Sequence, residues 1–236
     1  MTNRNVDLAS GPTLSDLCRV GGIGALVAGV LTVADLAVFT VWPQPTAVAG
    51  WFALFQSNWL VGLLDFDLLG IFAYVILVPT ILALYLILRQ RSQAWMAIAT
   101  TFTLVGIAVY FASNTGFAVL SLSSQYASAV TEAQRSMLLA SGQALFAEFS
   151  ATAFGESFAM VSGALLITSV VMVKSGVFGA RTGWIGVIAN LLGLGGYVAY
   201  VPALYGLGLI MMFANPAFLG AWLILVGKSL RHMKAK

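Results

Sequence analysis

Six long apolar runs dominate this chain and limit the folds it can adopt. They cover about residues 20–42, 59–88, 94–120, 152–173, 184–204 and 207–227. A helix needs roughly 20 apolar residues to cross a bilayer, because each residue advances it by only about 1.5 Å. Every run is long enough, and the second and third exceed the requirement, so tilt or protruding ends are expected. The runs predict six transmembrane helices.

Composition supports a membrane environment over an aqueous one. Hydrophobic residues make up 60% of the chain, charged residues 8%, and the mean hydropathy is +0.97. Soluble domains carry roughly 25% charged residues, because their outer surface faces water. The sequence therefore predicts an all-α fold, a polytopic helix bundle whose first partner is the lipid bilayer.

The distribution of Lys and Arg predicts the orientation of the bundle. With both termini cytoplasmic, the inner segments hold ten basic residues and the outer ones only Arg135. The inner set is Arg4, Arg19, Arg89, Arg91, Lys174, Arg181, Lys228, Arg231, Lys234 and Lys236. Cytoplasmic loops are normally enriched in such residues. This pattern predicts topology in an inner membrane and gives no reason to expect nucleic-acid binding.

The runs also divide the chain into segments. We expect a mobile cytoplasmic tail at 1–18, a membrane domain at 19–230 and a basic cytoplasmic tail at 231–236. Residues 121–151 should form an outer loop, partly helical, that caps the bundle. The uncharged segment 43–57 should lie on the outer interface, where Trp51 would join an aromatic belt.

Polar residues gather near the outer ends of the predicted spans. Five acids and two amides fall at this depth: Asp35, Asp65, Asp67, Glu148, Glu156, Asn114 and Asn215. An ionised carboxylate at a helix centre costs about 2.5–3.5 kcal/mol on insertion scales. Such groups should therefore face a wet vestibule, bind a cation or a basic partner, or be protonated. Arg135 is the natural ion-pair partner, but one base cannot neutralise five acids.

Asp65 and Asp67 pose a separate question, because they are two residues apart. On a regular helix they would project in nearly opposite directions, so only one would face the bundle interior. A local unwinding beside Gly62 or Gly70 would change that expectation.

Several kinds of chemistry are excluded by what the chain lacks. Cys18 is the only cysteine and His232 the only histidine. An internal disulfide is therefore ruled out, as are a bis-histidine haem site and a histidine-based zinc or nucleophile site inside the membrane. We expect no cofactor, leave the question of a metal open, and favour a role other than catalysis.

Three long stretches resemble the uncharacterised bacterial membrane family called DUF4386. They are "YFASNTGFAVLSLSSQYASA" (110–129), "AQRSMLLASGQAL" (133–145) and "VVMVKSGVFGARTGWIGVIANLLGLGGYV" (170–198). The resemblance covers most of the chain from Arg19 to about Leu230. It implies a multi-span protein of the bacterial inner membrane and supplies no activity or catalytic residues.

The expected function is binding of a small molecule or cation in a polar, acidic pocket open to the outer side, as in a transporter or sensor. The alternatives are a structural or accessory subunit with an empty hydrated funnel, and a carboxylate- or metal-dependent enzyme acting on a lipid-like substrate. The oligomeric state is left open.

Overall fold

The computed structural model describes residues 12–42, 44–199 and 201–233. All regular structure within these ranges is helical, and six helical segments are long and apolar enough to cross a membrane. The prediction of an all-α bundle with six spans is confirmed, and the architecture is that of a multi-pass membrane protein. Residues 1–11 and 234–236, which belong to the predicted tails, lie outside the described residues.

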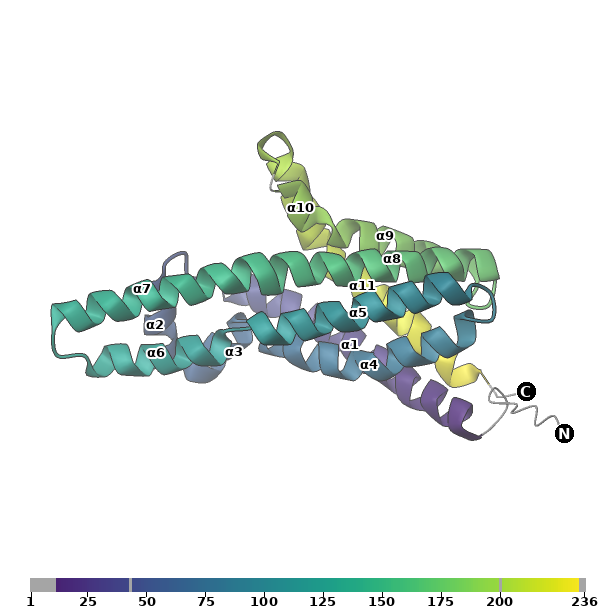
Figure 1. Ribbon diagram of the computed structural model, residues 1–236, viewed down its shortest axis with the longest axis horizontal. Helices are drawn as coiled ribbons and strands as arrows, with labels where there is room; N and C mark the ends of the chain where they lie inside the picture. The colour runs from purple at the N-terminus through teal and green to yellow at the C-terminus, as the bar shows by residue number, and fades with distance from the viewer. Residues whose placement is uncertain (1–11, 43, 200, 234–236) are drawn as a thin grey trace, which may run out of the picture.

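The first span starts earlier than expected. Helix α1 runs from Pro12 to Val41, so the last seven residues of the predicted 1–18 tail are helical. Helix α11 (Tyr205–His232) ends beside the start of α1. We call this end of the molecule the terminal end and the opposite one the hairpin end (Figure 1).

The second predicted span is two helices. Helix α3 (Trp59–Asp65) ends at Phe66, and α4 (Leu68–Leu88) begins after Asp67. Helix α2 (Val48–Ser57) precedes them and buries Trp51 at 2% exposure against Phe66, with ring centroids 5.0 Å apart. Trp51 is therefore part of an aromatic cluster at the hairpin end, and the expectation of a belt position was wrong for this residue.

The largest departure from expectation is at residues 121–151. Helix α5 (Gln93–Ser113) continues after a break at Asn114 into α6 (Gly116–Ser128), and α7 (Glu132–Glu148) returns from a short turn. A π-helix (Phe149–Ser157) then joins α7 to α8 (Phe158–Ser175). The predicted outer loop is thus a helical hairpin that projects beyond the other helices (Figure 1). Thr131 and Gln134 form a capping box that stabilises its turn.

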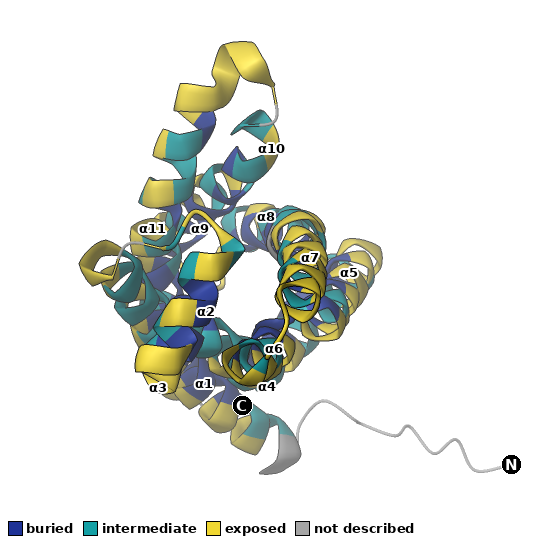
Figure 2. Ribbon diagram, turned by 90° about the vertical axis from the view of Figure 1, so that its left-hand side faces the viewer, coloured by how far each residue is buried: buried dark blue, intermediate teal, exposed yellow. Residues whose placement is uncertain are grey.

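The last two spans are shorter and more broken. Helix α9 (Ala180–Gly193) is followed by the short α10 (Gly195–Ala199), a 3-10 turn (Pro202–Leu204) and then α11. In both views α10 and the adjoining end of α11 stand apart from the other helices (Figures 1 and 2). Gly176 ends α8 with φ of +68°, a left-handed conformation that favours glycine.

Two apolar clusters hold the bundle together. One lies toward the terminal end between α1, α4, α8 and α11, and includes Leu84, Leu165 and Leu223. The other is the aromatic cluster at the hairpin end. The space between the two clusters holds the site described next.

Candidate functional site

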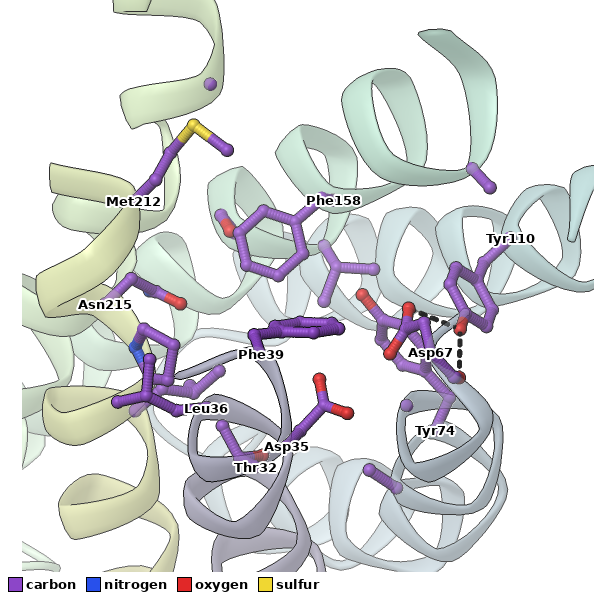
Figure 3. Close-up of a pocket in the computed structure, with 18 of the residues that line it drawn as sticks. Thr32, Asp35, Leu36, Phe39, Asp67, Tyr74, Tyr110, Phe158, Met212 and Asn215 are labelled. Carbon is purple, nitrogen blue, oxygen red and sulfur yellow. Dashed lines mark hydrogen bonds between the residues drawn. The ribbon is translucent and has the colours of Figure 1, made fainter. Parts of the chain in front are cut away.

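A cavity of about 680 Å³ lies between α1, α4, α8 and α11 (Figure 3). Most of its wall is aliphatic or aromatic, so it is less polar than the predicted pocket. Its polar lining comes from Thr32, Asp35, Gln44, Asp67, Tyr74, Tyr110, Ser150, Ser162, Asn190 and Asn215. None of the described lining residues is Lys, Arg or His. The cavity is therefore an apolar space whose only charge-bearing side chains near neutral pH are acids.

The two acids that line the cavity lie near each other. The side chains of Asp35, on α1, and Asp67, before α4, face each other in the cavity (Figure 3). Two ionised carboxylates close together in an apolar space repel each other, so the pair favours a proton or a cation beside it. The Oδ1 atom of Asp35 is buried and has no hydrogen-bond partner among the described residues. The acid pair thus leaves one acceptor available in an apolar space.

The position of Asp67 follows from a break in the helix. Its φ of 70° is the only positive value among the described non-glycine residues, and Asp tolerates this conformation better than most. The turn directs its carboxyl group against Gly70, where a Cβ would collide with both carboxyl oxygens. Two residues earlier, Asp65 is fully buried, but it does not line the cavity, and neither of its carboxyl oxygens has a hydrogen-bond partner. Asp67 is therefore the acid of this stretch that belongs to the site.

Tyr110 holds the Asp67 carboxyl group in place. Its hydroxyl group lies 2.6 Å from Oδ2 of Asp67 and donates to it, and the Nδ2 atom of Asn114 donates to the same hydroxyl group over 3.1 Å. The rings of Tyr74 and Tyr110 are 4.6 Å apart between centroids. Asn114 supports the site through Tyr110 without lining the cavity itself.

The opposite side of the cavity presents an amide. Asn215 is 2% exposed, and its Nδ2 atom donates to the backbone oxygen of Ala189 over 2.8 Å. Its amide oxygen accepts no hydrogen bond from the described residues and points into the cavity (Figure 3). Phe39 lies between Asn215 and Asp67, with Phe158 nearby (Figure 3). The cavity thus has an acid lobe around Asp35 and Asp67 and an amide lobe around Asn215, with phenyl rings between them.

The remaining predicted site residues lie elsewhere. Arg135 is on the projecting hairpin and pairs with Glu132 over 3.4 Å. Glu148 and Glu156 are exposed and do not line the cavity. Depth in the membrane brought these residues into the prediction, but depth does not determine which side of a helix a residue occupies.

The aromatic residues of the site were missed by the sequence analysis. Tyr74 lies two helical turns after Asp67, and Tyr110 lies one turn before Asn114, so each shares a helix face with a predicted residue. That spacing was the available signal. Tyrosine in a membrane helix is common, however, and the spacing alone did not distinguish these two.

The described residues contain no group of three or more His, Cys, Asp or Glu side chains that could hold a metal ion. Asn190, by contrast, serves helix packing, because its Nδ2 atom donates to Ser169 on α8 over 3.3 Å and to Gly186 over 2.7 Å. This agrees with the interhelical hydrogen bonding that is common for amides in membrane helices. The carboxyl pair is thus the chemically distinctive feature of the cavity.

Comparison with known proteins adds no further constraint: no protein-family model, no curated protein and no solved structure matches this chain.

Proposed function

We propose that this protein binds a small organic cation with an apolar body in the cavity between α1, α4, α8 and α11. The observation that carries the proposal is the pair of neighbouring carboxyl groups, Asp35 and Asp67, in an aromatic-lined space with no basic side chain among its described lining residues. A cation beside these two carboxyl groups compensates their negative charge, which is costly to leave unpaired in an apolar space.

The rest of the cavity suits the remainder of such a ligand. Its volume of about 680 Å³ is in the range of sites for drug-sized molecules. The faces of Tyr74 and Tyr110 beside the acids favour a cation through their ring quadrupoles. The free amide oxygen of Asn215 is available to a hydrogen-bond donor at the other end of the ligand.

The proposal includes the setting of the protein. We propose a bacterial inner membrane, cytoplasmic termini and membership of the DUF4386 family, on the basis of the Lys and Arg bias and the three sequence stretches given above. The cavity would then face the outer side. The apolar cluster toward the terminal end, which includes Leu84, Leu165 and Leu223, closes the other side of the cavity. A cavity closed on that side suits either a receptor or the outward-facing state of a transporter.

Binding of tetraphenylphosphonium to protein in lipid nanodiscs tests the proposal. We expect Asp35→Asn and Asp67→Asn each to weaken binding by about tenfold or more, because each removes one carboxylate that can carry negative charge beside the cation. Asp16→Asn, an exposed acid on the same helix α1, is the matched control and should leave affinity unchanged. Equal affinities in all four proteins would contradict the proposal.

The same experiment has a defined pH dependence. A cation and protons compete for the Asp35 and Asp67 carboxylates, so binding should strengthen as pH rises. The other titratable groups nearby are Asp65, Tyr74 and Tyr110. Affinity is measured between pH 5 and pH 8, roughly the range over which proteins are commonly stable. Wild-type affinity should rise with pH over this range. The rise should be smaller in Asp67→Asn.

The acid pair also favours a second candidate, a carboxylate-dependent membrane enzyme acting on a lipid-like substrate. Paired carboxyl groups that share a proton can divide the roles of acid and base. Mass spectrometry of a lipid extract incubated with wild-type and Asp67→Asn protein tests this candidate. A product formed only by the wild type would support it. Absence of both binding and product would favour the structural or accessory role.

A further inference from the structure

We infer that the cavity opens sideways into the membrane between α1 and α11, and that its ligand is an amphiphile that enters from the hydrocarbon phase. The inference rests on the proposed function for the charge of the ligand. The sideways opening itself rests on separate observations of helix geometry and exposure.

One residue connects the cavity to the membrane-facing surface directly. Phe213 lines the cavity and is also 66% exposed. It belongs to a candidate membrane span, and on the same helix Ile210 is 68% exposed and Leu207 51% exposed. An apolar surface of this kind within a span faces lipid rather than water. The cavity wall at Phe213 is therefore also a lipid-facing surface.

The two helices separate for a physical reason. Toward the terminal end α1 and α11 are in close backbone contact, since a Cβ on Gly29 would be 2.9 Å from the Gly220 oxygen and one on Gly220 would be 3.0 Å from the Gly29 oxygen. One turn further on, Pro216 lies inside α11, and proline in a helix interior kinks it. Beyond that point α11 and α10 diverge from the bundle (Figures 1 and 2). The divergent part of α11 supplies Leu209, Met212 and Phe213 to the cavity wall.

Gly196 offers a position at which the edge of the cavity can be blocked. It is on α10 and lines the cavity, and a Cβ built on it meets no atom within 4 Å. A larger side chain at this position would therefore extend into open space at the edge of the cavity.

The chemistry of the two lobes then indicates the ligand class. Its apolar part can remain in contact with Phe213 and Met212 while its cationic group passes Phe39 to reach the acid pair. An anionic lipid is disfavoured, because its headgroup would meet carboxyl groups with no base to compensate. A lipophilic amine or quaternary ammonium compound combines the two requirements.

The kinetics of tetraphenylphosphonium binding in nanodiscs test the opening. Gly196→Trp should reduce the association and dissociation rates together, by about tenfold, with little change in affinity, because a plug blocks passage in both directions. Gly206→Trp is the matched control, since Gly206 also has open space around it but does not line the cavity. Unchanged rates in Gly196→Trp alongside normal affinity would overturn the sideways opening and leave the proposed function standing.

A labelling experiment needs no ligand and separates the two proposals further. In a Cys18→Ala background, a cysteine at Phe39 is exposed to N-hexadecylmaleimide dissolved in the bilayer or to a sulfonated maleimide in water. We expect the bilayer reagent to react, and Gly196→Trp, but not Gly206→Trp, to slow it. Reaction with the aqueous reagent alone, or no effect of Gly196→Trp, would refute entry from the membrane.

Discussion

Asp67 combines three constraints in one residue: a left-handed backbone, a buried carboxyl group and a hydrogen bond from Tyr110. Backbone conformations of this kind cost of order 1–3 kcal/mol and persist only where the surroundings compensate. The Tyr110 hydroxyl group and the absence of a side chain at Gly70 are the compensation that the structure shows. Each can be removed by a single substitution.

Gly70→Ala should displace the Asp67 carboxyl group, because the new Cβ would collide with both of its oxygens. We expect a loss of stability of about 1–3 kcal/mol, as for other overpacked sites. Tetraphenylphosphonium binding should weaken by about tenfold. Gly163→Ala on α8 is the control: a Cβ there meets no atom within 4 Å, so stability should be unchanged or rise by up to about 1 kcal/mol. Equal behaviour of the two variants would show that the Asp67 geometry is not constrained by Gly70.

Tyr110→Phe removes the donor to Asp67 and the acceptor for Asn114 while keeping the ring. Leaving buried polar groups unpaired should lower the free energy of unfolding by about 1–3 kcal/mol. Equilibrium unfolding in mixed micelles measures this. Tyr205→Phe, at a tyrosine that is 56% exposed, should change stability by less than about 0.5 kcal/mol. If the Tyr110→Phe protein were as stable as the control, the result would contradict the supporting role that we assign to Tyr110.

The site was only partly predictable from sequence, for a reason visible in individual residues. Hydropathy gives depth, and three residues of the predicted depth, Asp35, Asp67 and Asn215, line one cavity in the structure. Glu148 and Glu156 share that depth but face outward. The rotational position of a helix is decided by packing against its neighbours, which one sequence does not reveal. The choice between Asp65 and Asp67 depended on a helix break that propensity alone does not place.

At the scale of elements, close contact between α1 and α11 holds the terminal half of the bundle together. Gly220→Ala would bring a Cβ to 3.0 Å from the Gly29 oxygen and into collision with a methyl group of Val33. We expect the helices to be forced apart at a cost of about 1–3 kcal/mol. Gly206→Ala, on the same helix but in open space, is the control. Thermal unfolding of both variants decides the matter, and an unaffected Gly220→Ala protein would show that the contact is not tight.

The spans were predictable and the projecting hairpin was not, because different physics forms them. Apolar length specifies a membrane helix, since lipid offers no hydrogen bonds to its backbone. Residues 121–151 are polar enough to leave the membrane, and polarity alone does not distinguish a loop from a helix in water. The local signals were the Thr131–Gln134 capping box and the stretch from Glu132 on, "EAQRSMLLASGQAL", in which most residues are good helix formers.

At the scale of the whole molecule, the hairpin tip and the α8–α9 turn lie at opposite ends, which makes orientation testable. In a Cys18→Ala background, a cysteine at Val130, which is 87% exposed, should react with a membrane-impermeant maleimide in intact cells. A cysteine at Val177, 38% exposed beside the terminal end, should react only after permeabilisation. We expect this protection because Lys and Arg are concentrated at the terminal end, and such residues are normally enriched on the cytoplasmic side. The reverse pattern would place the termini outside and the cavity facing the cytoplasm.

The π-helix at Phe149–Ser157 has a consequence for how the chain tolerates changes of length. Its backbone bonds span five residues instead of four, so it carries more residues per turn than the α-helices on either side. Deleting one residue here can be absorbed by tightening a turn to α-helical bonding, whereas the same deletion within α8 would rotate every following side chain out of register. Natural relatives of different length should therefore differ by single residues at this segment, with the hairpin before it and the span after it unchanged in length.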